Sequence, residues 1–296
     1  MNRSSAFEAY VAPARARNQI WRLLLGLALV VLVYLAWLLG TGALAWRLIG
    51  DDAMAGALAG LAAGTTPWSL VVLLFTFLGM GIGAALAVRL LHRRRVSSLF
   101  GPLRRVLADF LAVGLLAGVV FGAALFLWPG FGDLVAATDP GLWWRFLPLA
   151  LLGLLVQTGA EEVLFRGYLQ QQLAARFRSA LAWAVVPSVA FGLVHFDPVT
   201  MGGNAWLIVL ATAFFGLVAA DLTARTGSLG AAWGLHFVNN FFALFLVTMG
   251  GALDGLALYR LPDLDPAGPE LVPLLALDLV LLGLVWLVAR HWLRRP

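Results

Sequence analysis

The sequence predicts an all-α fold, a polytopic bundle of transmembrane helices. Hydrophobic residues make up 62% of the 296 residues and charged residues only 12%, whereas soluble domains carry about 25% charged residues. The apolar residues gather into about eight stretches of roughly 20 residues, the length that an α-helix needs to cross a bilayer. Arginine is unevenly distributed among the segments between these stretches. Composition, stretch length and arginine placement therefore all indicate an integral, multi-pass membrane protein.

The apolar stretches define eight expected spans. The first is too long for the core of a signal peptide, so we expect it to be retained as a helix. In the second, Gly79 and Gly83 are small residues one helical turn apart, which is typical of close helix packing. The fifth is short and contains Pro187. In chain order the expected spans are 20–46, 68–91, 106–128, 146–166, 180–196, 204–224, 229–250 and 271–290.

All 20 basic residues are arginines, and they indicate the sidedness of the bundle. With the N-terminus in the cytoplasm, 17 of them lie on the cytoplasmic side, and only Arg47, Arg145 and Arg260 lie outside. Cytoplasmic loops of membrane proteins carry such an excess of positive charge. We therefore expect both termini in the cytoplasm and a location in a cell membrane, the inner membrane of a bacterial cell. The same topological placement of the arginines argues against nucleic acid as a partner.

Four regions follow from this layout: a cytoplasmic N-terminal segment (1–19), N-terminal transmembrane helices (20–145), a core (146–250) that contains the motifs described below, and an outer loop with the last transmembrane helix and a basic tail (251–296). The chain has no cysteine, which excludes thiol proteases, iron–sulfur clusters, disulfides and zinc sites built on thiolates. It also lacks the HExxH motif of the common zinc metalloproteases.

Three short motifs place ionisable side chains within or beside the apolar stretches. An ionisable group at membrane depth costs about 3 kcal/mol on insertion scales, so each such group is a functional candidate by default. Two carboxylates, two imidazoles and an amide together suit a hydrolytic site. The motifs are Glu161-Glu162-xxx-Arg166, Phe191-xxx-His195 and His236-xxx-Asn240.

Helical geometry gives the two glutamates of the first motif different surroundings. Residues four apart share a helix face, so Glu162 can pair with Arg166. Glu161 points about 100° away and is left free for chemistry. His236 and Asn240 are also four apart, so both can face one cavity.

Hydrolysis of a peptide bond fits these residue types in two ways. In the first, Glu161 accepts a proton from water, His195 orients the water, and His236 and Asn240 donate to the developing oxyanion. In the second, Glu161, His195 and His236 ligate a divalent metal such as zinc, which activates the water. Asparagine is a poor zinc ligand, so Asn240 suits the oxyanion role better. The residue pattern leaves both mechanisms open.

With these motifs in this order, the chain resembles the CAAX-protease and bacteriocin-processing family, which includes the type II CAAX prenyl endopeptidases. The resemblance covers residues 157–245. It implies an intramembrane endopeptidase, usually regarded as a metalloprotease, that has the first glutamate, both histidines and the asparagine in its site. It also implies a membrane-associated peptide or protein as substrate. In a bacterium, leader peptides or other membrane-anchored peptides suit this role better than prenylated ones.

Two expectations concern the geometry of the site. Tyr168 lies seven residues after Glu161, on the same helical face, and we expect it to line the cavity. Counting about 1.5 Å per residue places Glu161 and His236 in the inner half of the membrane and His195 nearer the outside. A deeper start of the fifth helix, or a tilt around Pro187, would remove that conflict.

Two other classes of protein compete with an enzyme. A non-catalytic scaffold or immunity-type protein could retain the same fold, although the intact motifs argue against decay of the site. In a proton-coupled transporter, the Glu and His side chains would relay protons. That class predicts broken helices and repeat symmetry. Asp278 also lies within an expected span and receives no role from either mechanism.

Overall fold

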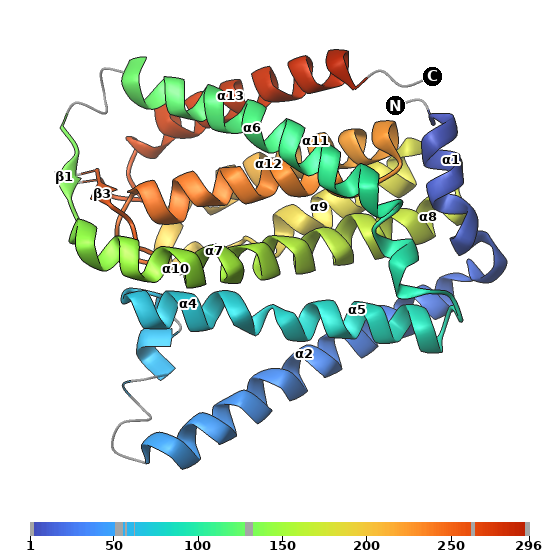
Figure 1. Ribbon diagram of the computed structural model, residues 1–296, viewed down its shortest axis with the longest axis horizontal. Helices are drawn as coiled ribbons and strands as arrows, with labels where there is room; N and C mark the ends of the chain where they lie inside the picture. The colour runs from blue at the N-terminus through green and yellow to red at the C-terminus, as the bar shows by residue number, and fades with distance from the viewer. Residues whose placement is uncertain are drawn as a thin grey trace.

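The computed structural model describes residues 3–50, 56, 58–61, 63–127, 133–261 and 264–293. The helices run roughly side by side, with the short strands at one end of the bundle and α1 at the other (Figure 1). The all-α class is confirmed, because the three strands in the described residues have only two residues each. Helix α1 and the end of α13 lie at the same end of the bundle (Figure 1).

In chain order the described elements include the π-helices η4, η5 and η7 and the 3-10 helices η1, η2 and η6. They are α1 (Ser5–Val11), η1 (Ala12–Arg17), α2 (Ile20–Ile49), α4 (Pro67–Thr76), α5 (Leu78–Leu90), η2 (Val96–Leu99), α6 (Leu103–Leu127), β1 (Val135–Ala136), α7 (Pro140–Glu162), η4 (Val163–Gln170), α8 (Gln171–Arg176), η5 (Leu181–Val185), α9 (Val186–Leu193), α10 (Pro198–Met201), η6 (Gly202–Asn204), α11 (Ala205–Thr226), α12 (Gly230–Phe241), η7 (Phe242–Leu246), β2 (Val247–Thr248), β3 (Tyr259–Arg260) and α13 (Leu271–Trp292).

Six helices in the described part of the chain are long and apolar enough to cross a membrane, by length and composition. The fifth and seventh expected spans correspond to shorter helical runs, Leu181–Leu193 and residues 230–246. Every expected span therefore has a helical counterpart, while the number of membrane crossings and the side of the termini remain predictions. The six are Ile20–Ile49, Pro67–Leu90, Val96–Leu127, Pro140–Arg176, Pro198–Thr226 and Leu271–Trp292. The expected basic tail includes residues 294–296, which lie outside the described residues.

The fourth helix is much longer than its expected range of 146–166. It runs from Pro140 to Arg176, through α7, η4 and α8. Three consecutive glutamines, 170–172, make the sequence after Arg166 look like an exit from the membrane, but all three are buried. Gln170 donates to the carbonyl of Ala220, and Gln171 donates to the carbonyl of Tyr10. Polar side chains that are bonded inside the bundle thus extend a helix that hydropathy alone would end.

Helix α7 occupies the centre of the arrangement. It contacts α4 and α5 on one side and α12 on the other, and α12 packs in turn against α6 and α11. Helix α2 packs along α5 (Figure 1). Gly83 allows this approach, because a Cβ added there would lie 2.8 Å from the Cα of Val30. The packing role expected for Gly79 and Gly83 is thereby confirmed, since an added Cβ at Gly79 would also clash, with the ring of Trp37.

The N-terminal segment closes the end of the bundle opposite the strands. Ser4 caps α1 by accepting from the amide of Phe7, and its hydroxyl donates to the carbonyl of Ala224. Phe7 is fully buried against the ring of Trp183. At the other end, β3 pairs with β1 in antiparallel and with β2 in parallel orientation, in the order β1-β3-β2. The three motifs lie between these two ends.

Candidate active site

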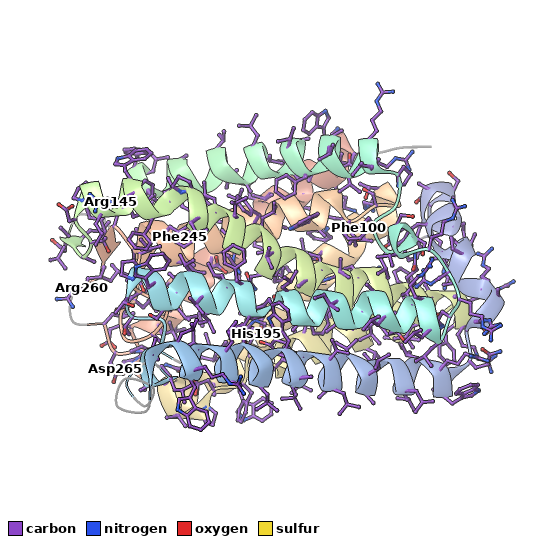
Figure 2. All side chains as sticks on the ribbon, turned by 60° about the horizontal axis from the view of Figure 1, so that its bottom comes forward. Phe100, Arg145, His195, Phe245, Arg260 and Asp265 are labelled. Atoms are coloured by element: carbon purple, nitrogen blue, oxygen red, sulfur yellow. The ribbon has the colours of Figure 1, made fainter. Side chains whose placement is uncertain are left out.

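A cavity of about 670 Å³ is lined by residues of the motif-bearing segments and of α2, α4 and α5. Four polar side chains from three different parts of the chain line it: Gln157, Glu161, His195 and Asn240. Most of the other lining residues are apolar, among them Val30 and Met80. Figure 2 shows His195 between the two ends of the bundle. The structure therefore brings members of all three motifs to one apolar cavity.

The two glutamates at the end of α7 have different surroundings, as their one-residue offset predicts. Glu162 is fully buried, and its Oε1 accepts from Arg166 Nη1 at 2.8 Å and from His236 Nδ1 at 2.8 Å. Glu161 lines the cavity instead. Its Oε2 is buried and has no hydrogen-bond partner within the described residues. The predicted Glu162–Arg166 pair is thus present, and Glu161 is the carboxylate that remains available.

Aromatic rings enclose Arg166, whose side chain is 2% exposed. Its guanidinium lies 4.6 Å from the ring centroid of Phe191 and 6.0 Å from those of Phe165 and Phe215. A cation held over ring faces in this way gains electrostatic stabilisation that partly replaces lost hydration. Phe191 of the second motif therefore supports the ion pair of the first.

The ring of His236 joins the two glutamates. Because the Glu162 carboxylate accepts at Nδ1, that nitrogen carries a proton, and Nε2 faces the cavity residues. Nε2 lies 3.5 Å from Glu161 Oε2 and 3.3 Å from Asn240 Nδ2. Phe215 and Phe191 contact the imidazole edge-on, with centroid separations of 5.0 Å and 5.9 Å. Packing and the Glu162 hydrogen bond thus fix the orientation of the ring.

His195 lies just beyond the end of α9 and is partly buried. Its Nδ1 lies 2.7 Å from the carbonyl oxygen of Phe191, which can only accept, so Nδ1 carries a proton. Nε2 is therefore the ring nitrogen that remains for the cavity. The depth conflict expected from residue counting does not arise, since His195 and Glu161 line the same cavity.

Gln157 is a site residue that sequence reasoning missed. Its Oε1 accepts from Asn240 Nδ2 at 3.1 Å, and Asn240 Nδ2 also approaches His236 Nε2. Gln157 lies one helical turn before Glu161, on the same face of α7. A polar side chain at that spacing within an apolar run was the signal that could have found it.

Tyr168 does not line this cavity, contrary to the expectation. Its hydroxyl lies 2.9 Å from Nε2 of His92, and the side chain is fully buried against Gly26. The intervening residues from Val163 form a π-helix. That helix needs more residues for each turn than an α-helix, so a seven-residue spacing no longer returns to the same face.

A zinc site usually has three protein donors. Nε2 of His236 and Oε2 of Glu161 converge, and both atoms are of suitable type. Among the described residues, however, no group of three or more His, Cys, Asp or Glu side chains is placed to hold one metal ion. The arrangement supplies two converging donors rather than the predicted three.

The fold and site define a polytopic helical membrane protein with a buried carboxylate, imidazole and amide cluster. Residues 141–242 match the family described as "Type II CAAX prenyl endopeptidase Rce1-like". This range contains all three motifs, so the resemblance predicted from them is confirmed.

A curated relative, described as "Uncharacterized protein YyaK" of Bacillus subtilis (strain 168), is 28% identical over 178 residues. The match covers 58% of this chain and 59% of the relative, so the chain spans less than two thirds of that protein's length. No solved structure matches the chain.

Proposed function

We propose that the protein is an intramembrane endopeptidase that hydrolyses a peptide bond of a membrane-associated peptide or protein. The observation that carries the proposal is the Oε2 atom of Glu161. This oxygen is buried, has no hydrogen-bond partner within the described residues and lies 3.5 Å from His236 Nε2 at the cavity. A buried polar atom without a partner is costly and is common where a substrate or water completes the site.

In the proposed reaction, Glu161 accepts a proton from a water molecule in the cavity. The water oxygen attacks the carbonyl carbon of the peptide, and the carbonyl oxygen becomes an oxyanion. His195, with Nδ1 held by the Phe191 carbonyl, orients the water through Nε2. The proton then passes from Glu161 to the leaving nitrogen, the carbon–nitrogen bond breaks, and a carboxylic acid and an amine are released.

The oxyanion needs hydrogen-bond donors. Asn240 Nδ2 is directed at Gln157 Oε1 and His236 Nε2, so Asn240 must give up one of these contacts to donate to an oxyanion. Gln157 accepts through Oε1, which leaves its own amide N–H groups for the cavity that it lines. We therefore assign Gln157 to this role together with Asn240. His236 joins them only as an imidazolium, because its Nδ1 proton is already bonded to Glu162.

The cavity walls support a substrate held at the bilayer. Its lining combines four polar side chains with many apolar ones from α2, α4, α5 and η7. A soluble peptide would leave much of that surface without a partner. A peptide anchored by an apolar segment or by a lipid suits it better, which agrees with the prenyl endopeptidases for which the matching family is named.

The test compares purified wild type and Glu161→Gln against a library of membrane-anchored peptides in lipid nanodiscs. The substitution removes the base and nearly preserves its shape. We expect cleavage by the wild type and a loss of at least 1,000-fold in the variant, while Asp254→Asn, an acid outside the cavity lining, serves as the matched control. Full activity of Glu161→Gln would overturn the mechanism. Absence of cleavage by the folded wild type with every peptide would favour the scaffold alternative.

The same preparations also test the divalent metal that the family resemblance implies. His236 and Glu161 are the residues that would hold such an ion, which would supply Lewis-acid activation of water. Metal content is measured by mass spectrometry, and cleavage is measured with and without a chelator. Activity that survives removal of all metal would support Glu161 acting alone as the base. If cleavage requires a stoichiometric metal, activation of water by that metal would replace the mechanism in which Glu161 acts alone.

A further inference from the structure

A second cavity, of about 310 Å³, lies on the α13 side of α12. Helices α6 and α13, together with η7 and β2, supply most of its wall, and the side chains there are largely apolar, among them Phe121, Phe242 and Leu274. Asp278 and Asn239 are polar exceptions. Neither belongs to the machinery proposed for hydrolysis.

Asp278 has no evident structural role. It lies seven residues into α13, about 10 Å along the helix axis from Leu271. No side chain or backbone group in the described part of the chain donates a hydrogen bond to it or forms an ion pair with it. Ionisable side chains inside membrane spans are rare and usually paired. A carboxylate without a protein partner therefore indicates a positively charged ligand.

The other polar groups of the cavity narrow the choice of ligand. Asn239 Nδ2 donates to Asn240 Oδ1 at 3.3 Å, which leaves its Oδ1 as an acceptor. Thr248 Oγ1 already accepts from the amide of Gly250. A primary ammonium group offers three N–H donors and a positive charge. It therefore complements a carboxylate and an amide oxygen better than an alcohol, which offers one donor and no charge.

From this arrangement we propose that the cavity binds an amphiphilic primary amine, with its ammonium group on Asp278 and its apolar chain against the α6 and α13 walls. The site is separate from the catalytic cavity, although Ala243 lines both and Asn239 bonds to Asn240. Binding there does not depend on whether the protein is a protease.

The test uses the purified full chain in nanodiscs of phosphatidylcholine, a lipid that contains no primary amine. A long-chain primary amine carrying a photoreactive diazirine is cross-linked, and the labelled peptides are mapped by mass spectrometry. We expect saturable labelling of peptides from η7 and α13. Dodecylamine should compete for this labelling, whereas dodecanol should compete at least tenfold less effectively.

Two variants and one control substitution make the result decisive. Asp278→Asn keeps the shape but removes the charge and should reduce labelling at least tenfold, whereas Asp254→Asn should leave it unchanged. Leu274→Trp should also abolish labelling, because it fills the cavity while Asp278 remains. Equal labelling of the wild type and folded Asp278→Asn, or equal competition by dodecanol, would overturn the proposal. If Asp278→Asn does not fold, Leu274→Trp and the alcohol competition decide.

Discussion

His236 Nδ1 and Glu162 Oε1 lie 2.8 Å apart in a part of the bundle where both side chains are buried. The same oxygen accepts from Arg166 Nη1. Through this one oxygen, the second glutamate of the pair orients the histidine and balances the charge of the arginine. This relationship assigns different tasks to two adjacent carboxylates and leaves Glu161 as the only one of them facing the cavity.

The first prediction is that Glu162→Gln destabilises the protein. The substitution leaves Arg166 buried without a counter-charge, and breaking a buried pair in this way costs about 3–5 kcal/mol. Denaturant titration in mild detergent, followed by tryptophan fluorescence, measures the change. The double variant Glu162→Gln with Arg166→Met removes both charges and should recover part of the lost stability. Equal stability of wild type and Glu162→Gln would contradict the structural role.

The second prediction concerns Gln157. Gln157→Leu removes the acceptor for Asn240 and the proposed oxyanion donor, and loss of one such donor lowers kcat by about 100- to 1,000-fold. KM should change much less, because the donor acts on charge that develops only in the transition state. Steady-state kinetics on a cleaved peptide separates the two effects. An unchanged kcat would exclude Gln157 from the oxyanion site.

Much of the site could be predicted from the sequence, because its main contacts follow α-helical spacing. The Glu162–Arg166 pair and the contact between His236 and Asn240 are both i,i+4 relationships. Gln157 was missed because a neutral amide in an apolar run attracts less attention than a charge. Its partner, Asn240, lies 83 residues away, and only the fold brings them together.

Tyr168 shows why the remaining geometry could not be predicted. Its position follows from the π-helix between Val163 and Gln170, and no residue in that segment marks a change of helical period. The buried glutamines that follow also could not be predicted, and they extend this helix beyond its expected end at Arg166. Their acceptors are backbone carbonyls of distant segments, including that of Tyr10, so their burial depends on tertiary contacts rather than on local hydropathy.

The third prediction separates Tyr168 from catalysis. Gly26→Ala should destabilise the protein by several kcal/mol, because the new Cβ would lie 1.8 Å from the Tyr168 hydroxyl oxygen. Tyr168→Phe removes only the contact with His92, at a cost of about 1 kcal/mol. Combining Gly26→Ala with Tyr168→Phe should relieve part of the clash. Thermal unfolding compares the three variants, and cleavage by Tyr168→Phe should stay within about twofold of wild type. A loss of activity without a loss of stability would instead place Tyr168 in the site.

The fourth prediction is a pH dependence of stability that originates outside the spans, at His92. This side chain lies in the loop between α5 and η2, where Nδ1 donates to the Arg17 carbonyl at 2.8 Å and Nε2 accepts from the Tyr168 hydroxyl. Burial lowers the pKa of His92, the Arg17 carbonyl opposes that shift, and nearby arginines reinforce it. The folded protein therefore holds this imidazole in its neutral form.

Because the pKa of His92 is lower in the folded state than its unfolded value near 6.5, the unfolded chain binds the extra proton first as the pH falls. Stability from this group is complete above about pH 6.5 and is lost as the pH falls from there toward the folded pKa. Each unit by which the pKa of His92 is lowered corresponds to about 1.4 kcal/mol.

Unfolding free energies at pH 7.5 and 5.5 should differ less in His92→Gln than in wild type, since glutamine offers one donor and one acceptor but does not titrate. The control is His291→Gln at the exposed end of α13, which should retain the wild-type difference. An identical pH dependence in His92→Gln and wild type would show that this loop does not sense protons.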